Sequence, residues 1–333
     1  MTSLLQVDNL TIRFPRAEPV RNLSFEIGHS ETLAIVGESG SGKSLTALAL
    51  MQLLPRAAEI AAESRISFGG RELTGLAARE MRHLRGREIA MIFQEPMTSL
   101  NPVMTIGRQI AEVLMVHEKL SGRAARRRAI ELLELVRIPA PDKRVDDYPH
   151  QLSGGMRQRV MIAIAVACKP KLLIADEPTT ALDVTIQAQV LDLLDTLRRE
   201  LRMAVILITH DLGVVAQWAD NVVVMYAGRK VEQALPGDLF DDPLHPYTRG
   251  LLSASPRLKR DFHYRDGPLT EIPGSIVSAV GEAGCPFRPR CNQARASCGH
   301  HVPPLIVPAE DRLVACPFTT SSKAVPHAAS LRF

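Results

Sequence analysis

The sequence predicts an α/β fold in which a mixed sheet is flanked by helices. Short apolar segments typical of buried strands alternate with helical segments between residues 31 and 232, and a glycine-rich loop follows the first of these strands. Residues 105–168 show helical periodicity without strand signals, and 13 of the 23 prolines lie in residues 234–333. We therefore expect a sheet-based core with an antiparallel β subdomain, a helical subdomain and a cysteine-rich C-terminal appendage.

The composition is that of a globular protein. A chain of 333 residues can form two domains, or one large domain with an appendage. The net charge of +4 is too small to indicate nucleic-acid binding by itself. The N-terminus lacks the basic and apolar regions of a signal peptide, and the longest apolar run, residues 160–168, is too short for a membrane span. We expect a cytosolic protein whose role at a membrane would come through partners.

Two strands are expected near the N-terminus, at residues 4–14 and 23–27, where apolar and polar residues roughly alternate. Pro15 and Pro19 separate them, so an antiparallel hairpin or small sheet is predicted to lead into the first buried strand. Phe14 ends the first segment. Its ring could stack on an adenine base or could simply pack in the core, and the sequence favours neither.

Residues 37–44 match the pattern G-x-x-x-x-G-K-[ST] of a P-loop, a loop that wraps phosphate groups. A strand at 31–36 precedes it, and a helix over 44–54, ended by Pro55, follows. Glycines let backbone N–H groups turn toward one anion, the lysine can reach the β- and γ-phosphates, and the serine hydroxyl can bind Mg²⁺. A glycine turn before a helix is the simpler alternative. The predicted nucleotide-binding residues here are Gly37, Glu38, Ser39, Gly40, Ser41, Gly42, Lys43 and Ser44.

Further strands are expected at residues 65–68 and 89–94, and the second ends at Gln94, which standing alone would be a structural residue. Helical stripes follow, one of which carries a basic face formed by Arg123 and residues 126–128. This face is expected to be solvated, and docking to an acidic surface is the alternative.

A second helix N-terminus suited to an anion follows at residues 151–159. Ser153 is placed as the N-cap, and Gly154 and Gly155 would let the backbone approach a ligand closely. An ordinary capped helix start is the alternative.

Polar residues follow two buried strands, at residues 171–176 and 204–209. Asp176 is placed to hold Mg²⁺ through its coordinated water, and Glu177 to orient an attacking water. Asp183 ends a polar turn before a helix over residues 184–200. His210 ends the other strand, and because ligands of such sheets gather at strand C-termini, a shared site is expected.

Four of the five cysteines lie between residues 285 and 316, separated by five, six and seventeen residues. In a reducing compartment such a cluster favours metal or cofactor ligation over disulfides. The spacing differs from that of zinc fingers, and two of the cysteines precede proline, as in one ferredoxin cysteine run. That run ligates an iron–sulfur cluster, so such a cluster is one candidate here. Zinc, with His300 or His301 replacing a thiolate, and free thiols are the alternatives. The four are Cys285, Cys291, Cys298 and Cys316.

Taken together, these motifs resemble the nucleotide-binding subunit of an ABC transporter. Residues 37–44 resemble Walker A, Gln94 the Q-loop, 152–158 the signature, 172–177 Walker B, 181–183 the D-loop and His210 the H-loop. Residues 178–189, 245–252 and 272–274, with the cysteine-bearing tail, are similar to the oligopeptide/dipeptide/nickel importer branch, of the dipeptide/oligopeptide permease D type. The resemblance covers the chain to about residue 318.

The resemblance implies a mechanism. Two ATPase subunits, head to tail, would sandwich ATP and Mg²⁺, so that Ser153 and Gly155 contact a γ-phosphate held by the partner. Glu177 would act as the general base or as a group that orients the water, His210 would brace the γ-phosphate, and Gln94 would sense Mg²⁺ and water while touching the membrane subunits. The tail is similar to one that holds a [4Fe-4S] cluster. The expected partners are two membrane permease subunits, a second ATPase, and, indirectly, a solute-binding protein, at the cytoplasmic face of the cell membrane.

The resemblance and the shift in composition near residue 234 together predict a nucleotide-binding domain (1–234, with its helical subdomain at about 95–168) and a C-terminal extension (235–320). Residues 321–333, which the resemblance does not cover, are expected to form a flexible tail. The function implied is ATP hydrolysis that powers the import of peptides or related small solutes, possible cargoes including nickel. A non-transport ABC ATPase acting on nucleic acid or ribosomes is the alternative.

Overall fold

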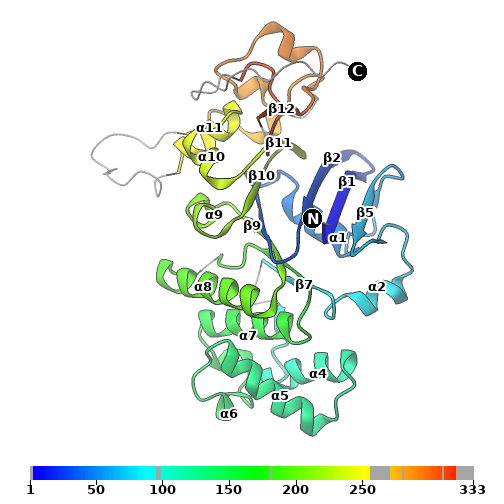
Figure 1. Ribbon diagram of the computed structural model, residues 1–333, viewed down its shortest axis with the longest axis vertical. Helices are drawn as coiled ribbons and strands as arrows, with labels where there is room; N and C mark the ends of the chain where they lie inside the picture. Colours follow the sequence, from blue (N-terminus) through cyan, green and yellow to red (C-terminus); the bar gives the residue numbers. More distant parts are fainter. Residues whose placement is uncertain are drawn as a thin grey trace.

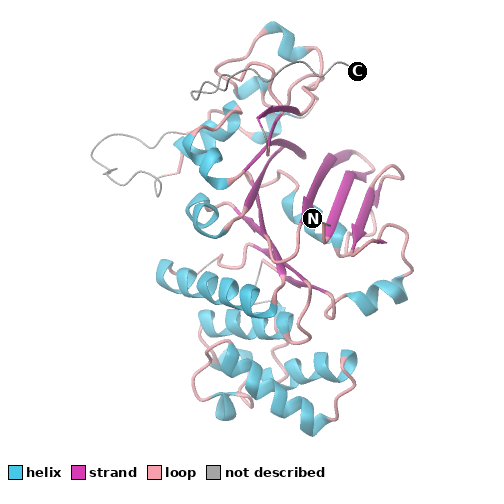
Figure 2. Ribbon diagram, viewed as in Figure 1, coloured by secondary structure: helices cyan, strands magenta, loops and turns pink. Residues whose placement is uncertain are grey.

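A large mixed sheet runs through the centre of the molecule (Figures 1 and 2). The computed structural model describes residues 3–94, 99–180, 182–255, 271–279, 281–309 and 311–319. The strand order is β12-β13-β11-β10-β3-β9-β8-β7. The strands from β10 to β7 are parallel, and β11, β13 and β12 continue the sheet in antiparallel fashion. The predicted mixed sheet is confirmed. Its strands are β3 (Thr32–Val36), β7 (Ile89–Ile92), β8 (Leu172–Asp176), β9 (Ala204–Thr209), β10 (Asn221–Tyr226), β11 (Arg229–Ala234), β12 (Ile306–Ala309) and β13 (Arg312–Val314).

The central strands are buried on both faces, which is why they consist almost entirely of apolar residues. In β8, Leu173 and Ala175 belong to the hydrophobic cluster that includes the helical part of the chain. The alternate residues Leu172 and Ile174 belong to the cluster formed with the small sheet. The strand ends are thereby fixed from both sides.

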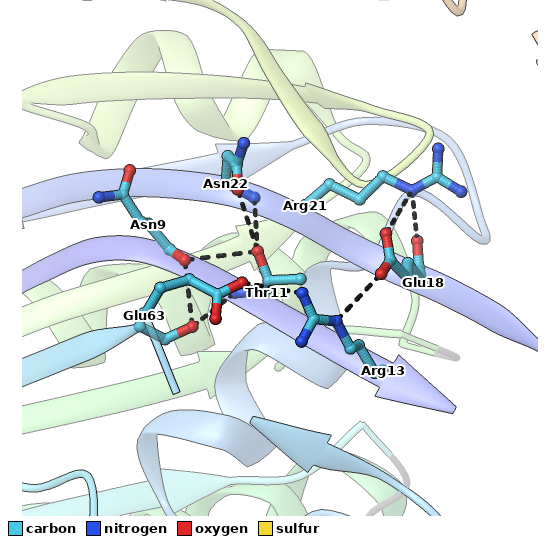
Figure 3. Close-up of polar contacts among 8 residues, drawn as sticks. Asn9, Thr11, Arg13, Glu18, Arg21, Asn22 and Glu63 are labelled. Carbon is cyan, nitrogen blue, oxygen red and sulfur yellow. Dashed lines mark hydrogen bonds and ion pairs between the residues drawn. The ribbon is translucent and has the colours of Figure 1, made fainter. Parts of the chain in front are cut away.

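The predicted antiparallel β subdomain is confirmed as a five-stranded sheet beside the large one. The pairing of β1 with β2 contains register shifts, and side chains complete the hydrogen bonding there: the Asn22 N–H donates to the Thr11 hydroxyl (3.0 Å). Arg13 bridges Glu18 (3.0 Å) and Glu63 (2.8 Å), as Figure 3 shows. The strands are β1 (Leu5–Phe14), β2 (Ala17–Ile27), β4 (Glu59–Ile60), β5 (Arg65–Phe68) and β6 (Arg71–Glu72). Pro19, expected in a turn, lies inside β2.

The expected helical segment forms one end of the molecule (Figure 1). Its predicted stripes face inward: Ile106, Ile110 and Leu114 are buried, as are Ala125 and Leu132. The helices are α4 (Ile106–His117), α5 (Gly122–Leu135), α6 (Pro141–Arg144) and α7 (Gly154–Val166), with a 3₁₀ turn η1 (Pro149–Gln151). The other helices that the structure describes before residue 234 are α1 (Lys43–Leu50), α2 (Ala78–Leu84), α8 (Val184–Leu201) and α9 (Leu212–Trp218).

The helix after the glycine loop is shorter than the sequence predicts. It ends at Leu50, not at Leu54, because Gln52 adopts a left-handed backbone conformation (φ 48°). Arg85 then donates hydrogen bonds to the carbonyls of Met51 (2.7 Å) and Gln52 (2.8 Å). The helix end is therefore capped by a side chain from a distant segment.

Residues after 234 are more regular than the expected loop-rich appendage. They form α10 (Pro236–Asp241), α11 (Pro246–Ser253), the 3₁₀ turns η4 (Ile276–Ala279), η5 (Arg288–Arg290) and η6 (Ala296–Gly299), and the sheet-edge strands β12 and β13. Because β13 pairs with β11, this region continues the large sheet. A buried ion pair supports the junction, with Arg312 3.6 Å from Glu232 and 3.5 Å from Asp242. The expected flexible tail lies outside the described residues.

Across the described ranges, no helix is long and apolar enough to span a membrane.

Candidate nucleotide-binding site

The glycine loop fits tightly between two strands. A side chain at Gly37 (φ +151°) would place its Cβ 2.2 Å from the Met225 carbonyl oxygen of β10, and one at Gly42 (φ +99°) 2.6 Å from the Pro19 carbonyl oxygen of β2. Both positions require glycine, because of the close approach and the left-handed backbone. Helix α1 begins directly after Gly42 without a side-chain cap, which leaves its first N–H groups available to an anion.

Lys43 arches back over this loop. Its Nζ donates to the carbonyl oxygens of Gly37 (2.8 Å) and Glu38 (2.9 Å), and lies 3.4 Å from the Ser41 hydroxyl. Burial lowers the pKa of Lys43, while Glu177, Asp176 and Glu38 oppose that shift. An ammonium group held by neutral carbonyls in a buried place can exchange them for the phosphate oxygens of a nucleotide.

Ser44 and Asp176 form the second part of the site. The Ser44 hydroxyl lies 3.2 Å from Asp176 Oδ1, at the C-terminal end of β8. Burial raises the pKa of Asp176, its hydrogen bond with Ser44 lowers it, and the net shift is upward. A bound Mg²⁺ would oppose that rise, and one carboxylate with one hydroxyl suits this ion, which completes its shell with water and phosphate oxygens.

Glu177 gathers three polar partners. Its Oε2 accepts from Gln94 Nε2 (3.0 Å) and from the Thr180 hydroxyl (2.9 Å), and its Oε1 lies 3.2 Å from His210 Nδ1. Burial raises the pKa of Glu177, but the hydrogen bonds from Thr180 and His210 and the charge of Lys43 together outweigh it, and the net shift is downward. The carboxylate is therefore ionised at neutral pH, the state that a general base requires.

The backbone of Glu177 is itself unusual. It adopts φ +48°, a left-handed conformation that costs a side-chain-bearing residue free energy, and its N–H donates to the Ile208 carbonyl oxygen of β9 (2.9 Å). This kink aims the side chain along the strand ends toward Gln94 and His210. The structure thus brings together Lys43, Ser44, Asp176, Glu177, Gln94 and His210, which the sequence placed on four separate segments.

Thr180 is a residue that the sequence analysis missed. The only available signal was a hydroxyl three positions after Glu177, within a segment that looked like an ordinary polar turn. Ala181, at the start of the predicted D-loop, lies outside the described residues.

The predicted signature residues stand at the start of helix α7. Ser153 caps α7 by accepting from the Met156 N–H (3.3 Å), and in the described part of the chain it makes no hydrogen bond to the glycine loop. There is also a packing reason for a glycine at position 155, because a Cβ there would lie 2.7 Å from the Ile186 side chain of α8. Asp183 caps α8 through the Ile186 N–H (3.0 Å), and Gly154 lies beside Leu182.

Phe14 ends β1 opposite Ala17 and packs partly buried against the core of the small sheet. The same hairpin brings Pro19 against Gly42, so this end of the small sheet borders the loop.

The four C-terminal cysteines are free thiols, all partly buried. Burial is the largest cause that raises the pKa of Cys285 to about 11, and the other three thiols contribute to the same rise, which places the four in one small region. Backbone N–H groups point at these sulfurs, from Phe287 to Cys285 and from Arg295 to Cys298 (3.4 Å). Within the described ranges, however, no three His, Cys, Asp or Glu side chains are arranged to hold a single metal ion.

A phosphate-binding loop that faces two strand-end acids, a glutamine and a histidine defines an ABC-type ATPase. A family model described as "ABC transporter" matches residues 20–180, and one described as "Oligopeptide/dipeptide transporter, C-terminal region" matches 231–298. A solved dimer of the cassette MJ0796, bound to ADP and phosphate, superposes with a TM-score of 0.62 at 26% identity and covers 70% of this chain and 98% of that one.

The sequences of curated relatives indicate which group of ABC-type ATPases this chain resembles. The oligopeptide transport ATP-binding protein OppD of Bacillus subtilis is 54% identical over 279 residues, which are 83% of this chain and 77% of the relative. OppD of Salmonella typhimurium is 49% identical over 318 residues, 94% and 93% of the two chains. The chain therefore belongs to the ATP-binding subunits of the oligopeptide/dipeptide family of ABC transporters.

Proposed function

We propose that this chain hydrolyses ATP to power the import of peptides through a membrane ABC transporter. The observation that carries the proposal is the convergence of Glu177 with Gln94, Thr180 and His210 beside the Walker A loop. The family membership and the names of the relatives, which are peptide transport ATP-binding proteins, supply the process that hydrolysis would drive.

In the proposed mechanism the glycine loop and the start of α1 bind the triphosphate, and Lys43 leaves its carbonyl partners for the β- and γ-phosphates. Mg²⁺, held by Ser44 and Asp176, would neutralise charge that develops on the phosphate oxygens. Glu177 accepts a proton from the attacking water, and Gln94 and His210 orient the carboxylate and the γ-phosphate.

The signature helix is proposed to act on a second subunit. Ser153 and Gly155 begin α7, a thirteen-residue helix whose N-terminus can face an anion. Since solved cassettes that superpose on this chain are dimers, the γ-phosphate that this N-terminus meets would be bound by a partner ATPase. Phe14 is proposed to stack on the adenine and Asp183 to border the dimer contact. We also propose that the nucleotide-binding domain ends at residue 234 and that the C-terminal extension ends near residue 320.

The proposal includes a [4Fe-4S] cluster at Cys285, Cys291, Cys298 and Cys316. Two observations support it: the four thiols lie within electrostatic reach of one another, and their spacing along the chain differs from that of ordinary zinc fingers. N–H groups directed at the sulfurs are a feature that tunes such clusters. The test is the absorbance spectrum and iron content of anaerobically purified protein: a broad visible band with about four irons supports the cluster, and a colourless protein with one zinc contradicts it.

The test of the import function uses the tagged full chain in its native cells. We expect it to copurify with two integral membrane permeases, and we expect a strain that lacks the chain to lose uptake of a labelled peptide. Restored uptake with the wild-type chain but not with Lys43→Ala would support the proposal, and nickel uptake measured in parallel separates the two cargo classes. Recovery of nucleic acid without permeases would instead favour the non-transport alternative, which the relatives do not favour.

A further inference from the structure

The C-terminal region reaches the Walker A loop at three points. The Tyr247 hydroxyl of α11 accepts from the Glu38 N–H (2.9 Å), and Arg290 Nη1 of η5 lies 2.9 Å from Glu38 Oε2. Ile276 of η4 lies beside the loop, 3.8 Å from the place a Cβ on Gly40 would occupy. Three elements beyond residue 234 therefore contact two residues of the phosphate-binding loop.

Arg290 is firmly held in this position. Its side chain is 3% exposed, its Nε donates to the Pro273 carbonyl oxygen (2.8 Å), and its Nη2 donates to that of Ile272 (3.3 Å). The guanidinium also lies over the Tyr226 ring, 5.7 Å from its centroid. A charge this buried needs an opposite charge, and the Glu38 carboxylate is the partner.

Glu38 depends on Arg290 in turn. Its Oε1 is buried without a hydrogen-bond partner in the described part of the chain, so the ion pair through Oε2 is what compensates the burial of the carboxylate. The backbone of Glu38 is also held on both sides, with its N–H bound to Tyr247 and its carbonyl oxygen bound to Lys43 Nζ (2.9 Å). A displacement of Glu38 would therefore move the catalytic lysine as well.

These contacts are continuous with the cysteine segment. Phe287 packs against Tyr226 (ring centroids 5.2 Å apart) and Tyr247 (5.4 Å), and its N–H points at the Cys285 thiol. Arg290 directly precedes Cys291. The segment that carries the first two cysteines thus also carries the ring and the guanidinium that hold Glu38.

We propose that Arg290 and Tyr247 are positioning residues for the Walker A loop, through which the C-terminal cysteine region sets the affinity for ATP. The inference rests on the proposed binding of ATP at this loop. When a nucleotide enters, Lys43 must leave the carbonyls of Gly37 and Glu38 for phosphate. The contacts from the C-terminal region keep Glu38 in place during that exchange, and by reciprocity bound ATP stabilises residues 272–279 and 285–291.

The test compares Arg290→Gln with Arg288→Gln in the full chain. Arg288 lies in the same 3₁₀ turn and pairs with Glu282 (3.0 and 3.1 Å), but it is exposed and does not touch the loop, so it is a matched control. We expect Arg290→Gln to weaken the binding of a fluorescent ATP analogue about fivefold or more, and Arg288→Gln to leave it unchanged. Tyr247→Phe, which removes one hydroxyl, should weaken binding in the same direction if Arg290→Gln folds poorly.

Hydrogen exchange gives a readout that a merely structural role would not move. ATP should slow amide exchange in residues 285–291 of the wild-type chain and of Arg288→Gln, but not of Arg290→Gln. Equal affinities for Arg290→Gln and wild type, or no effect of ATP on these amides in the wild type, would overturn the inference. Failure of the wild type to bind the analogue at all, with Lys43→Ala as the negative control, would instead count against the proposed function.

Discussion

Gly42 offers the sharpest test of how the phosphate-binding loop is built, because a side chain there would destabilise the fold for two separate reasons. Its φ of +99° is left-handed, and an added Cβ would lie 2.6 Å from the Pro19 carbonyl oxygen and 3.0 Å from Val20 Cγ2. Gly70 is the matched control, since its φ of +78° is also left-handed but an added Cβ would have no atom within 4 Å. The difference between Gly42→Ala and Gly70→Ala isolates the close approach.

The magnitudes follow from these contacts. Each alanine pays about 1–2 kcal/mol for the left-handed backbone. At Gly42 the contact must open from 2.6 Å to the ordinary 3.4 Å, so the loop or β2 moves by about 0.8 Å, which resembles overpacking and costs a further 1–3 kcal/mol, roughly. The same movement withdraws N–H groups from the phosphates, and the loss of one charge-assisted hydrogen bond weakens ATP binding by about tenfold or more.

Thermal unfolding and titration with a fluorescent ATP analogue measure the two effects. We expect Gly70→Ala to unfold a few degrees below wild type and to bind ATP normally, and Gly42→Ala to unfold lower still and to bind weakly. If Gly42→Ala bound ATP like the wild type, or unfolded together with Gly70→Ala, the close packing of loop against β2 would be wrong.

Three other predictions address stability and the metal. Burial lowers the pKa of His245 to about 3, while its Nδ1 accepts from the Tyr247 N–H (3.1 Å). As pH falls below 6.5, only the unfolded chain gains a proton on this histidine, so the free energy of unfolding falls on acidification. By pH 5 the wild type should lose about 2 kcal/mol more stability than His245→Asn, which keeps a capping oxygen. Parallel curves of stability against pH for the two proteins would contradict this. Arg312→Met removes the buried cation that faces Glu232 and should cost about 3 kcal/mol in chemical unfolding. Arg126→Met, which breaks an exposed pair with Asp146, should cost less than about 1 kcal/mol, and similar costs for the two variants would disprove the buried network. EDTA should abolish ATP hydrolysis, and added Mg²⁺ should restore it. The Ser44→Ala variant should need a higher Mg²⁺ concentration than the wild type for this recovery, and an equal requirement would show that Ser44 does not bind the metal.

Local patterns were enough to predict most of the secondary structure. The central strands β3, β8 and β9 are runs of apolar residues because both of their faces are buried, and such runs are visible in the sequence. The convergence of Asp176, Glu177 and His210 followed from one rule, that parallel strands end at the same edge of a sheet.

What the sequence did not reveal depends on contacts between distant segments. The early end of α1 is fixed by Arg85, more than thirty residues away, and the pairing of β13 with β11 joins residues about eighty apart. Arg290 meets Glu38 across 252 positions. No local propensity encodes such contacts, and an arginine beside a cysteine cluster gives no sign that it holds a glutamate of the phosphate-binding loop.

The measurement that tests the central claim most directly is ATP turnover by Glu177→Gln in the presence of Mg²⁺, with ATP binding measured in parallel. The glutamine retains the shape of the side chain and can still accept from Thr180, but it cannot take a proton from water. We predict that ATP remains bound while turnover falls by about 10²- to 10⁴-fold. Hydrolysis at the wild-type rate by this variant would show that Glu177 is not the base and that the site has been assigned the wrong chemistry.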